Sequence, residues 1–280
     1  MKRTLRHQPI SLVWVLLTAC CVGQVSHGYE LKYGKNGEPM RWSESCAYYS
    51  IHQDGAPGLE LASVRNIIRD AFDRWEDVPC SYFLFEETEP SSCKDLGMHL
   101  DRGNINTLYW VTDNWEVDSE HKKNAVALTT VSWDRNTGQI LDADIEFNSE
   151  YFSFGSDGEH AKADLANTVV HEIGHFVGLQ HSSDPDATMY AAANPGETSK
   201  QTLETDDIDG LCELYPLDQD PEVCLLPYCG LDLDCTSTTC GSRKEAGGGV
   251  DSGDDGCHVV HTGANVNGGG WRGILSWVFS

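Results

Sequence analysis

Basic residues are scarce in this chain. Its 280 residues include 19 Lys and Arg against 44 Asp and Glu, which gives a formal net charge of −25. The sequence contains no basic run and no patch in which basic and aromatic residues alternate. A field this negative repels nucleic acid and anionic membranes, whereas it suits solubility or cation binding. Nucleic acid is therefore excluded as a predicted partner.

Hydrophobic runs long enough to cross a bilayer are also lacking. The apolar run from Ile10 to Ala19 is too short for a stable membrane span. It follows three basic residues and precedes small residues at Ser26 to Gly28, so residues 1–28 are predicted to be a signal peptide. The chain is therefore expected to be secreted. The alternative is a lipid anchor on a bacterial cell surface, because Leu17 to Cys20 resembles a lipobox with Cys20 as the lipidated residue.

Residues 29–216 have the pattern of one mixed α/β domain. Aromatic and β-branched stretches predict strands, and apolar residues at helical spacing predict three helices. The turn residues Asp134 to Gly138 predict that two extended stretches form a hairpin. The expected strands are 48–52, 82–85, 107–112 and the hairpin 125–148, and the expected helices are 61–79, 164–178 and 204–215.

The second arm of this hairpin alternates strictly between apolar and polar residues. Ala143, Ile145 and Phe147 are expected to share one face of the strand. The opposite face is polar and is expected to be solvated; it carries Asp142, Asp144, Glu146 and Asn148.

Residues 217–280 are predicted to be a Cys-rich and Gly/Asp-rich tail that is partly disordered. Nine of the eleven cysteines follow the signal, which indicates disulfides in an exported chain. Two small disulfides within the tail are favoured over a second zinc site, because no CxxC pairs occur among Cys224, Cys229, Cys235 and Cys240. The apolar end, Gly268 to Ser280, is either a sorting remnant or a weakly docked tail.

The stretch from His171 to His181 carries the predicted chemistry, with the pattern HExxHxxGxxH. Residues i and i+4 are neighbours on a helix, so His171 and His175 can grip one ion. A third ligand at His181 would lie about 15 Å along the axis of a continuing helix. Gly178 can adopt the positive φ that ends the helix and folds the chain back, so His181 can close the site.

Three imidazoles leave one position of a zinc ion open, which is typical of a catalytic site. A zinc ion lowers the pKa of bound water towards about 7 and polarises a carbonyl group. Glu172 is the predicted catalytic base, which takes the proton of the water and passes it to the leaving amine. The predicted function is that of a zinc-dependent endopeptidase.

At these residues the chain resembles a metzincin metalloprotease, and within that group a matrixin. Ser182 directly follows the third histidine, the stretch from Asp186 to Tyr190 is similar to the Met-turn, and residues 203–215 are similar to the C-terminal helix. The resemblance implies an α+β domain with a twisted, mostly parallel sheet, an antiparallel edge strand, an active-site helix and a C-terminal helix. It also implies that Met189 forms an apolar floor beneath the metal, with Tyr190 beside it.

The chain departs from the matrixin pattern in three places. No room for a prodomain is found before the first strand, and no cysteine-switch motif is found, so any latency must work in another way. The run of histidines for a structural zinc is missing, and His99, His121 and His160 are expected at the surface. The polar face of residues 142–148 only loosely resembles a calcium-binding strand, so a bound Ca²⁺ is the alternative to a solvated face.

The resemblance further implies that a protein or peptide substrate binds in extended form beside an edge strand. Residues 139–148 are the candidate for part of that edge, and residues 194–200 for the wall of the specificity pocket. Two disulfides are expected, Cys80–Cys93 and Cys46–Cys212.

Two other functions compete with the endopeptidase. The first is an exported binding module with structural zinc, in which a fourth protein ligand would close the site. The second is a zinc amidase that acts on cell-wall or small-peptide substrates. Internal cleavage of a long unfolded substrate such as casein separates the endopeptidase from both.

Overall fold

The computed structural model describes residues 27–94, 96–99, 102–156, 158, 162–226, 230–235 and 271–277. Most of the predicted signal, including Cys20, lies outside the described residues, as do His160 and three tail cysteines (Cys229, Cys240 and Cys257). In the described part of the chain, no helix is both long enough and apolar enough to cross a membrane.

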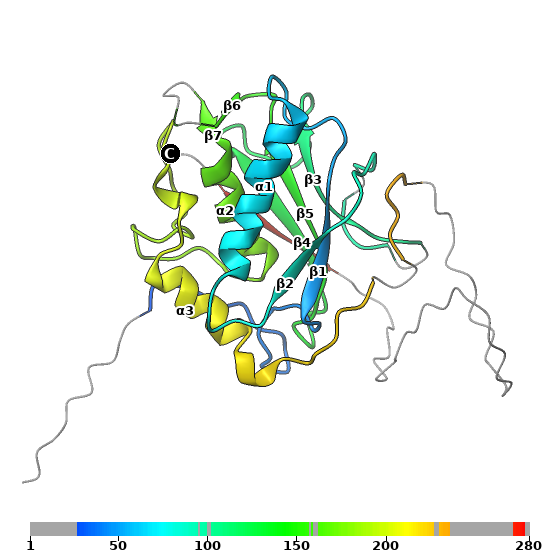
Figure 1. The fold of residues 1–280 in the computed structure, drawn as a ribbon, viewed down its shortest axis with the longest axis vertical. Coiled ribbons are helices and arrows are strands. Elements are labelled where there is room, and N and C mark those ends of the chain that lie inside the picture. Colours follow the sequence, from blue (N-terminus) through cyan, green and yellow to red (C-terminus); the bar gives the residue numbers. More distant parts are fainter. Residues whose placement is uncertain are drawn as a thin grey trace, which may run out of the picture.

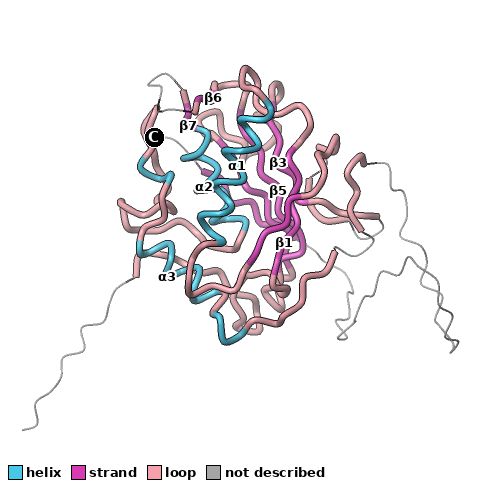
Figure 2. Tube along the Cα trace, in the orientation of Figure 1, coloured by secondary structure: helices cyan, strands magenta, loops and turns pink. Residues whose placement is uncertain are grey.

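A six-stranded sheet forms the centre of the molecule (Figures 1 and 2). Its order is β2-β1-β3-β5-β4-β8. Strands β2, β1, β3 and β5 are parallel, and β4 is antiparallel to β5. The strands are β1 (Cys46–Ile51), β2 (Leu84–Glu87), β3 (Asn106–Val111), β4 (Ala127–Trp133), β5 (Ile140–Asn148) and β8 (Trp271–Trp277), with a separate short pair, β6 (Phe154–Gly155) and β7 (Ala163–Asp164). This topology confirms the expected mostly parallel sheet with an antiparallel strand at the edge of residues 29–216.

Two of the three α-helices lie side by side over one face of the sheet (Figure 1). The helices are α1 (Leu61–Glu76), α2 (Leu165–Phe176) and α3 (Thr205–Leu214), with short 3₁₀ turns η1 (Ser199–Gln201) and η2 (Leu217–Gln219). The apolar stripe of α1 is buried against the sheet and against α2. Phe72 stacks on Tyr49 of β1 and meets Phe176 of α2 edge-on, and the Trp75 indole donates a hydrogen bond to Val170 O. These contacts fix α2, the predicted active-site helix, against the rest of the domain.

The polar face of β5 is buried, so the expectation of a solvated face was wrong. Asp142, Asp144, Glu146 and Asn148 are all at most 3% exposed. The Asp144 carboxylate accepts hydrogen bonds from the backbone N–H groups of Gly97 and Thr107. The loops before β3 and before β4 therefore cover a face that alternation alone assigns to solvent.

His121 is part of this buried face, so its expected surface position was also wrong. The imidazole lies between Asp118 and Glu146, with nitrogen–oxygen distances of 2.8 and 3.2 Å. Glu146 also accepts a hydrogen bond from the Tyr109 hydroxyl. His99 is half-buried.

Among the described residues, three disulfides join distant parts of the chain, and both predicted pairings were wrong. The observed bonds are Cys46–Cys224, Cys80–Cys212 and Cys93–Cys235. The first part of the tail returns along the start of β1, where Ser45 N donates to Val223 O, and along the stretch after β2, where Ser92 N donates to Leu233 O. Cys224 and Cys235 therefore pair with cysteines of residues 29–216 and not within the tail, because this return path brings them next to cysteines far away in the sequence.

The apolar C-terminal segment is docked. Residues 271–277 form β8, which pairs antiparallel with β4 along its whole length and is drawn in red in Figure 1. Of the two interpretations left open by the sequence, the structure favours the docked tail.

Candidate metal centre

Helix α2 presents His171 and His175 on one face, as the i, i+4 spacing predicts. Asp164 is the N-cap residue of the helix, and its side chain accepts a hydrogen bond from Asn167 N at 2.9 Å. Both imidazoles and Glu172 between them are completely buried. The helix therefore delivers two nitrogen ligands and one carboxylate to the interior of the domain.

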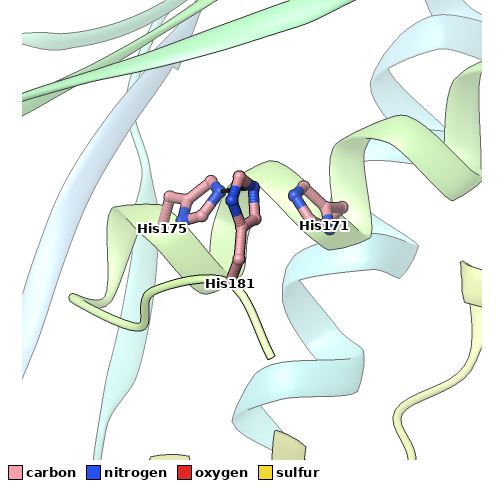
Figure 3. A group of neighbouring side chains, drawn as sticks. All are labelled: His171, His175 and His181. Atoms are coloured by element: carbon pink, nitrogen blue, oxygen red, sulfur yellow. Dashed lines mark hydrogen bonds between the residues drawn. The ribbon is translucent and has the colours of Figure 1, made fainter. Parts of the chain in front are cut away.

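Gly178 ends this segment in the way the sequence predicts. Its φ is +107°, and a Cβ atom at this position would lie 2.2 Å from Met40 O. Only glycine combines this backbone conformation with so close an approach. The chain then turns back, and His181 faces the two helical histidines from the following loop (Figure 3).

The three imidazoles meet at one point. One ring nitrogen from each of His171, His175 and His181 lies within 4.8 Å of the other two. The Nδ1 atom of His171 is 2.6 Å from Thr188 O, and the Nδ1 atom of His175 is 2.8 Å from Leu179 O. A ring nitrogen facing a carbonyl oxygen must carry the proton, so Nε2 of both rings keeps its lone pair for a metal ion.

Electrostatics keep these imidazoles neutral. Burial lowers the pKa of His171 well below its ordinary value, and the neighbouring imidazoles lower it further. Burial likewise lowers the pKa of His175 to about 3 and that of His181 to about 4. Neutral imidazole is the form that binds a metal, so the donor set, its tautomers and its convergence all fit a zinc ion.

Glu172 has one oxygen held and one oxygen available. The Thr129 hydroxyl of β4 donates a hydrogen bond to Oε2. The Oε1 atom is buried and has no hydrogen-bond partner within the described part of the chain. Burial raises the pKa of Glu172 to about 8, although the bond from Thr129 opposes this shift. A buried carboxylate with a raised pKa beside possible metal ligands is typical of a functional site.

Met189 lies beneath the helix, where the Met-turn resemblance places it. It is completely buried, and a Cβ atom at Gly174 would lie only 2.1 Å from its sulfur. The backbone N–H groups of Thr188 and Met189 donate to the Asp207 carboxylate of α3 at 2.8 and 2.9 Å. Thr188 O in turn accepts the hydrogen bond from His171 Nδ1, so α3 positions the turn and the turn positions a possible ligand.

Tyr190 and Lys200 are linked to the residue after His181 and to helix α2. Ser182 pairs with Tyr190 in an isolated parallel bridge, and the Lys200 ammonium donates to Tyr190 O. Lys200 N donates to the Asn167 side chain of α2 at 2.8 Å, so η1 packs against the active-site helix.

Three residues of the centre were missed from the sequence. Gly174 occupies an unspecified position of the motif, Thr129 is an ordinary strand residue, and Asp207 was assigned only to a helix. A glycine between the two helical histidines was the one visible signal, because glycine disfavours a helix interior unless close packing requires it.

The sheet, the active-site helix and the converging histidines define a metzincin-like domain. Comparison with known proteins gives the family: residues 41–216 match the family model described as Matrixin. The chain belongs to the matrixin family.

Individual relatives agree with this assignment. Human neutrophil collagenase is 28% identical over 185 residues, which are 66% of this chain and 35% of the relative. Human matrix metalloproteinase-16 is 30% identical over 192 residues, which are 68% of this chain and 30% of the relative. Metalloendoproteinase 1-MMP of Arabidopsis thaliana is 30% identical over 186 residues, or 64% of this chain and 45% of the relative. The chain thus matches less than half the length of each relative.

Proposed function

We propose that this protein is an exported zinc-dependent endopeptidase. The observation that carries the proposal is the meeting of three neutral imidazoles beside Glu172, whose Oε1 atom is buried without a hydrogen-bond partner in the described residues. Family membership supports a zinc metalloprotease, and names such as metalloendoproteinase support internal cleavage by this chain as well.

His171, His175 and His181 would hold one zinc ion, and the family and the histidine cluster both support this assignment. When bound, zinc would supply a Lewis acid that polarises the scissile carbonyl and acidifies water. Gly178 makes the return of His181 possible, and Met189 supplies the apolar floor under the site. Tyr190 supports the site from the side through its bridge to Ser182.

Glu172 would act as general base and then as general acid. Its free oxygen would take the proton of the attacking water and pass it to the leaving amine, and burial, which raises the pKa of the carboxyl, favours its role as a proton carrier. The Thr129 hydroxyl fixes the other oxygen, so the carboxylate needs no reorientation between the two steps.

An extended peptide would bind along β4, which is the edge strand of residues 29–216. The predicted shelf, residues 139–148, corresponds to β5, which is paired on both sides and offers no edge. The sequence placed the hairpin correctly. Its first arm, β4, is the outer strand, because β3 pairs with its second arm, β5. Residues 194–200, of which Lys200 donates a hydrogen bond to Asn167 of α2, would form the opposing wall of the specificity pocket.

Residues 1–28 would be the signal peptide, with lipidation at Cys20 as the alternative, and residues 29–216 the catalytic domain. The carboxylates of Asp144 and Glu146 already accept hydrogen bonds from protein groups, so the proposal assigns no Ca²⁺ to them. The acidic chain is not expected to bind nucleic acid.

The test separates metal binding from catalysis in the exported protein. Glu172→Gln should keep one equivalent of zinc and lose at least about 100-fold in casein cleavage, because only proton transfer is removed. His181→Ala should lose zinc itself. The binding module would be favoured if zinc-loaded protein, full-length or ending at residue 270, cleaved neither casein nor a peptide and Glu172→Gln changed nothing. Trimming from one end only would favour the amidase.

A further inference from the structure

The outer edge of β4 is occupied by the C-terminal strand. On one side β4 pairs with β5, and on the other side it pairs with β8, from Ala127 opposite Trp277 to Trp133 opposite Trp271. An unpaired edge presents a row of N–H and C=O groups to any extended peptide. In this structure β8, a segment of the same chain, pairs with that row of backbone groups.

The covered stretch of β4 is the one that touches the proposed catalytic base. Thr129, whose hydroxyl donates to Glu172, lies opposite Leu275 of β8, and Thr130 lies opposite Ile274. Helix α2, which carries Glu172 and two of the histidines, packs against β4. The backbone of β8 thus runs along β4 at the point nearest the reacting groups.

We propose that residues 271–277 are an internal ligand of the substrate-binding edge and hold the enzyme in a latent state. The inference rests on the proposed function, because it assigns the β4 edge to the substrate. An extended substrate and β8 would need the same hydrogen-bonding groups of β4, so only one of them can bind at a time. Displacement or removal of β8 opens the edge.

The tether makes this competition effective. Cys235 is bonded to Cys93, so the tail is fixed to the domain upstream of β8. Covalent linkage raises the effective concentration of a binding segment to the millimolar range, so even a weak strand excludes dilute substrate. The segment WRGILSW contains no acidic residue, although the whole chain is strongly acidic. Because this segment is itself mostly apolar, the substrate that competes with it is expected to be an apolar, extended peptide.

Two variants of the full chain remove β8 in different ways. One ends at residue 270 and keeps all three observed disulfides. The other carries Leu275→Pro, which removes a backbone donor from the strand, with Leu275→Val as the matched control that preserves strand pairing. With a short fluorogenic peptide, the truncated chain and the Pro variant should show kcat/KM at least tenfold above the full chain, and the Val variant should not.

Two measurements do not depend on activity. Backbone amides of residues 127–133 should exchange with solvent faster in the truncated chain than in the full chain. A synthetic peptide of sequence WRGILSW should bind the truncated chain with Glu172→Gln and restore that protection, and a scrambled peptide should not.

The outcomes separate the two proposals. Equal peptide cleavage by full and truncated chains, within twofold, together with unchanged amide exchange, overturns the latency and leaves the endopeptidase intact. If neither zinc-loaded form cleaves casein or peptide, the endopeptidase fails, and amide exchange and peptide binding still decide whether β8 occupies the β4 edge.

Discussion

Helix α2 and Met189 approach each other closely at Gly174. A Cβ atom there would lie 2.1 Å from the Met189 sulfur and 3.0 Å from its methyl carbon. Gly174→Ala should therefore destabilise the domain by about 1–3 kcal/mol, the usual cost of overpacking, although alanine is the better helix former. Denaturant unfolding of the zinc-free protein measures the effect.

The contact with Met189 can be tested by a double-mutant cycle. If the clash is the cause, Gly174→Ala combined with Met189→Ala should cost clearly less than the sum of the two single changes. Additive costs would show that the alanine methyl group meets another neighbour, and the assignment of Met189 as the floor of the site would be wrong.

The ligand residues could be predicted because their geometry is local. His171, Glu172 and His175 share one helix, and Gly178 explains how His181 returns. The supporting residues could not be predicted, since Asp207 and Thr129 reach the site only through long-range packing of α3 and β4. A sequence pattern identifies groups that act within one turn of a helix, whereas their partners depend on the tertiary fold.

At the scale of elements, the presence of a helix or strand was easier to predict than the residues that surround it. The hairpin and all three helices lie where periodicity and turn residues place them. The alternation of β5 identified its two faces, but it could not show that loops cover the polar one or that β3 pairs with β5. Alternation alone predicts that polar residues are solvated, even where they are buried against partners in irregular segments.

This buried polar face should make stability depend on pH through His121. Burial lowers the pKa of His121, but hydrogen bonds with Glu146 and Asp118 outweigh it and raise the pKa to about 9. Since the folded pKa lies above the unfolded value of about 6.5, the stabilisation is complete below pH 6.5 and is lost as the pH rises through 9. His121→Gln should therefore cost about 2 kcal/mol near pH 6 and much less near pH 10.

His52 provides a control with the opposite sign. Burial lowers its pKa, so the wild-type protein loses stability as the pH falls through the unfolded value of the imidazole. The stability difference between the wild type and His52→Gln should therefore shrink on acidification, whereas that for His121→Gln should grow. Parallel pH profiles for the two variants in urea unfolding would contradict the assignment of the His121 network.

At the scale of the whole molecule, the tail is part of the folded protein. The change in composition after Pro216 marks the end of the matrixin match at residue 216. It did not reveal that Cys224 and Cys235 are bonded to the domain or that β8 completes the sheet. Pairings across 178 and 142 residues leave no local pattern, because only the three-dimensional path of the chain brings such cysteines together.

The disulfide Cys46–Cys224 should anchor the start of the tail. It joins the first residue of β1 to a segment that also hydrogen-bonds Ser45. Replacing both cysteines by serine should lower the free energy of unfolding by about 2–5 kcal/mol, because the cross-link restricts a long loop of the unfolded chain. Residues 217–226 should also become sensitive to limited proteolysis, since their covalent hold on β1 is lost.

The pair Cys80–Cys212 is the matched control, because both cysteines lie within residues 29–216. Its serine variant should lose comparable stability without exposing residues 217–226 to protease, since Cys46–Cys224 still holds them. Non-reducing peptide mapping of the wild-type protein must join Cys46 to Cys224. A bond between Cys224 and another tail cysteine would contradict this path of the tail.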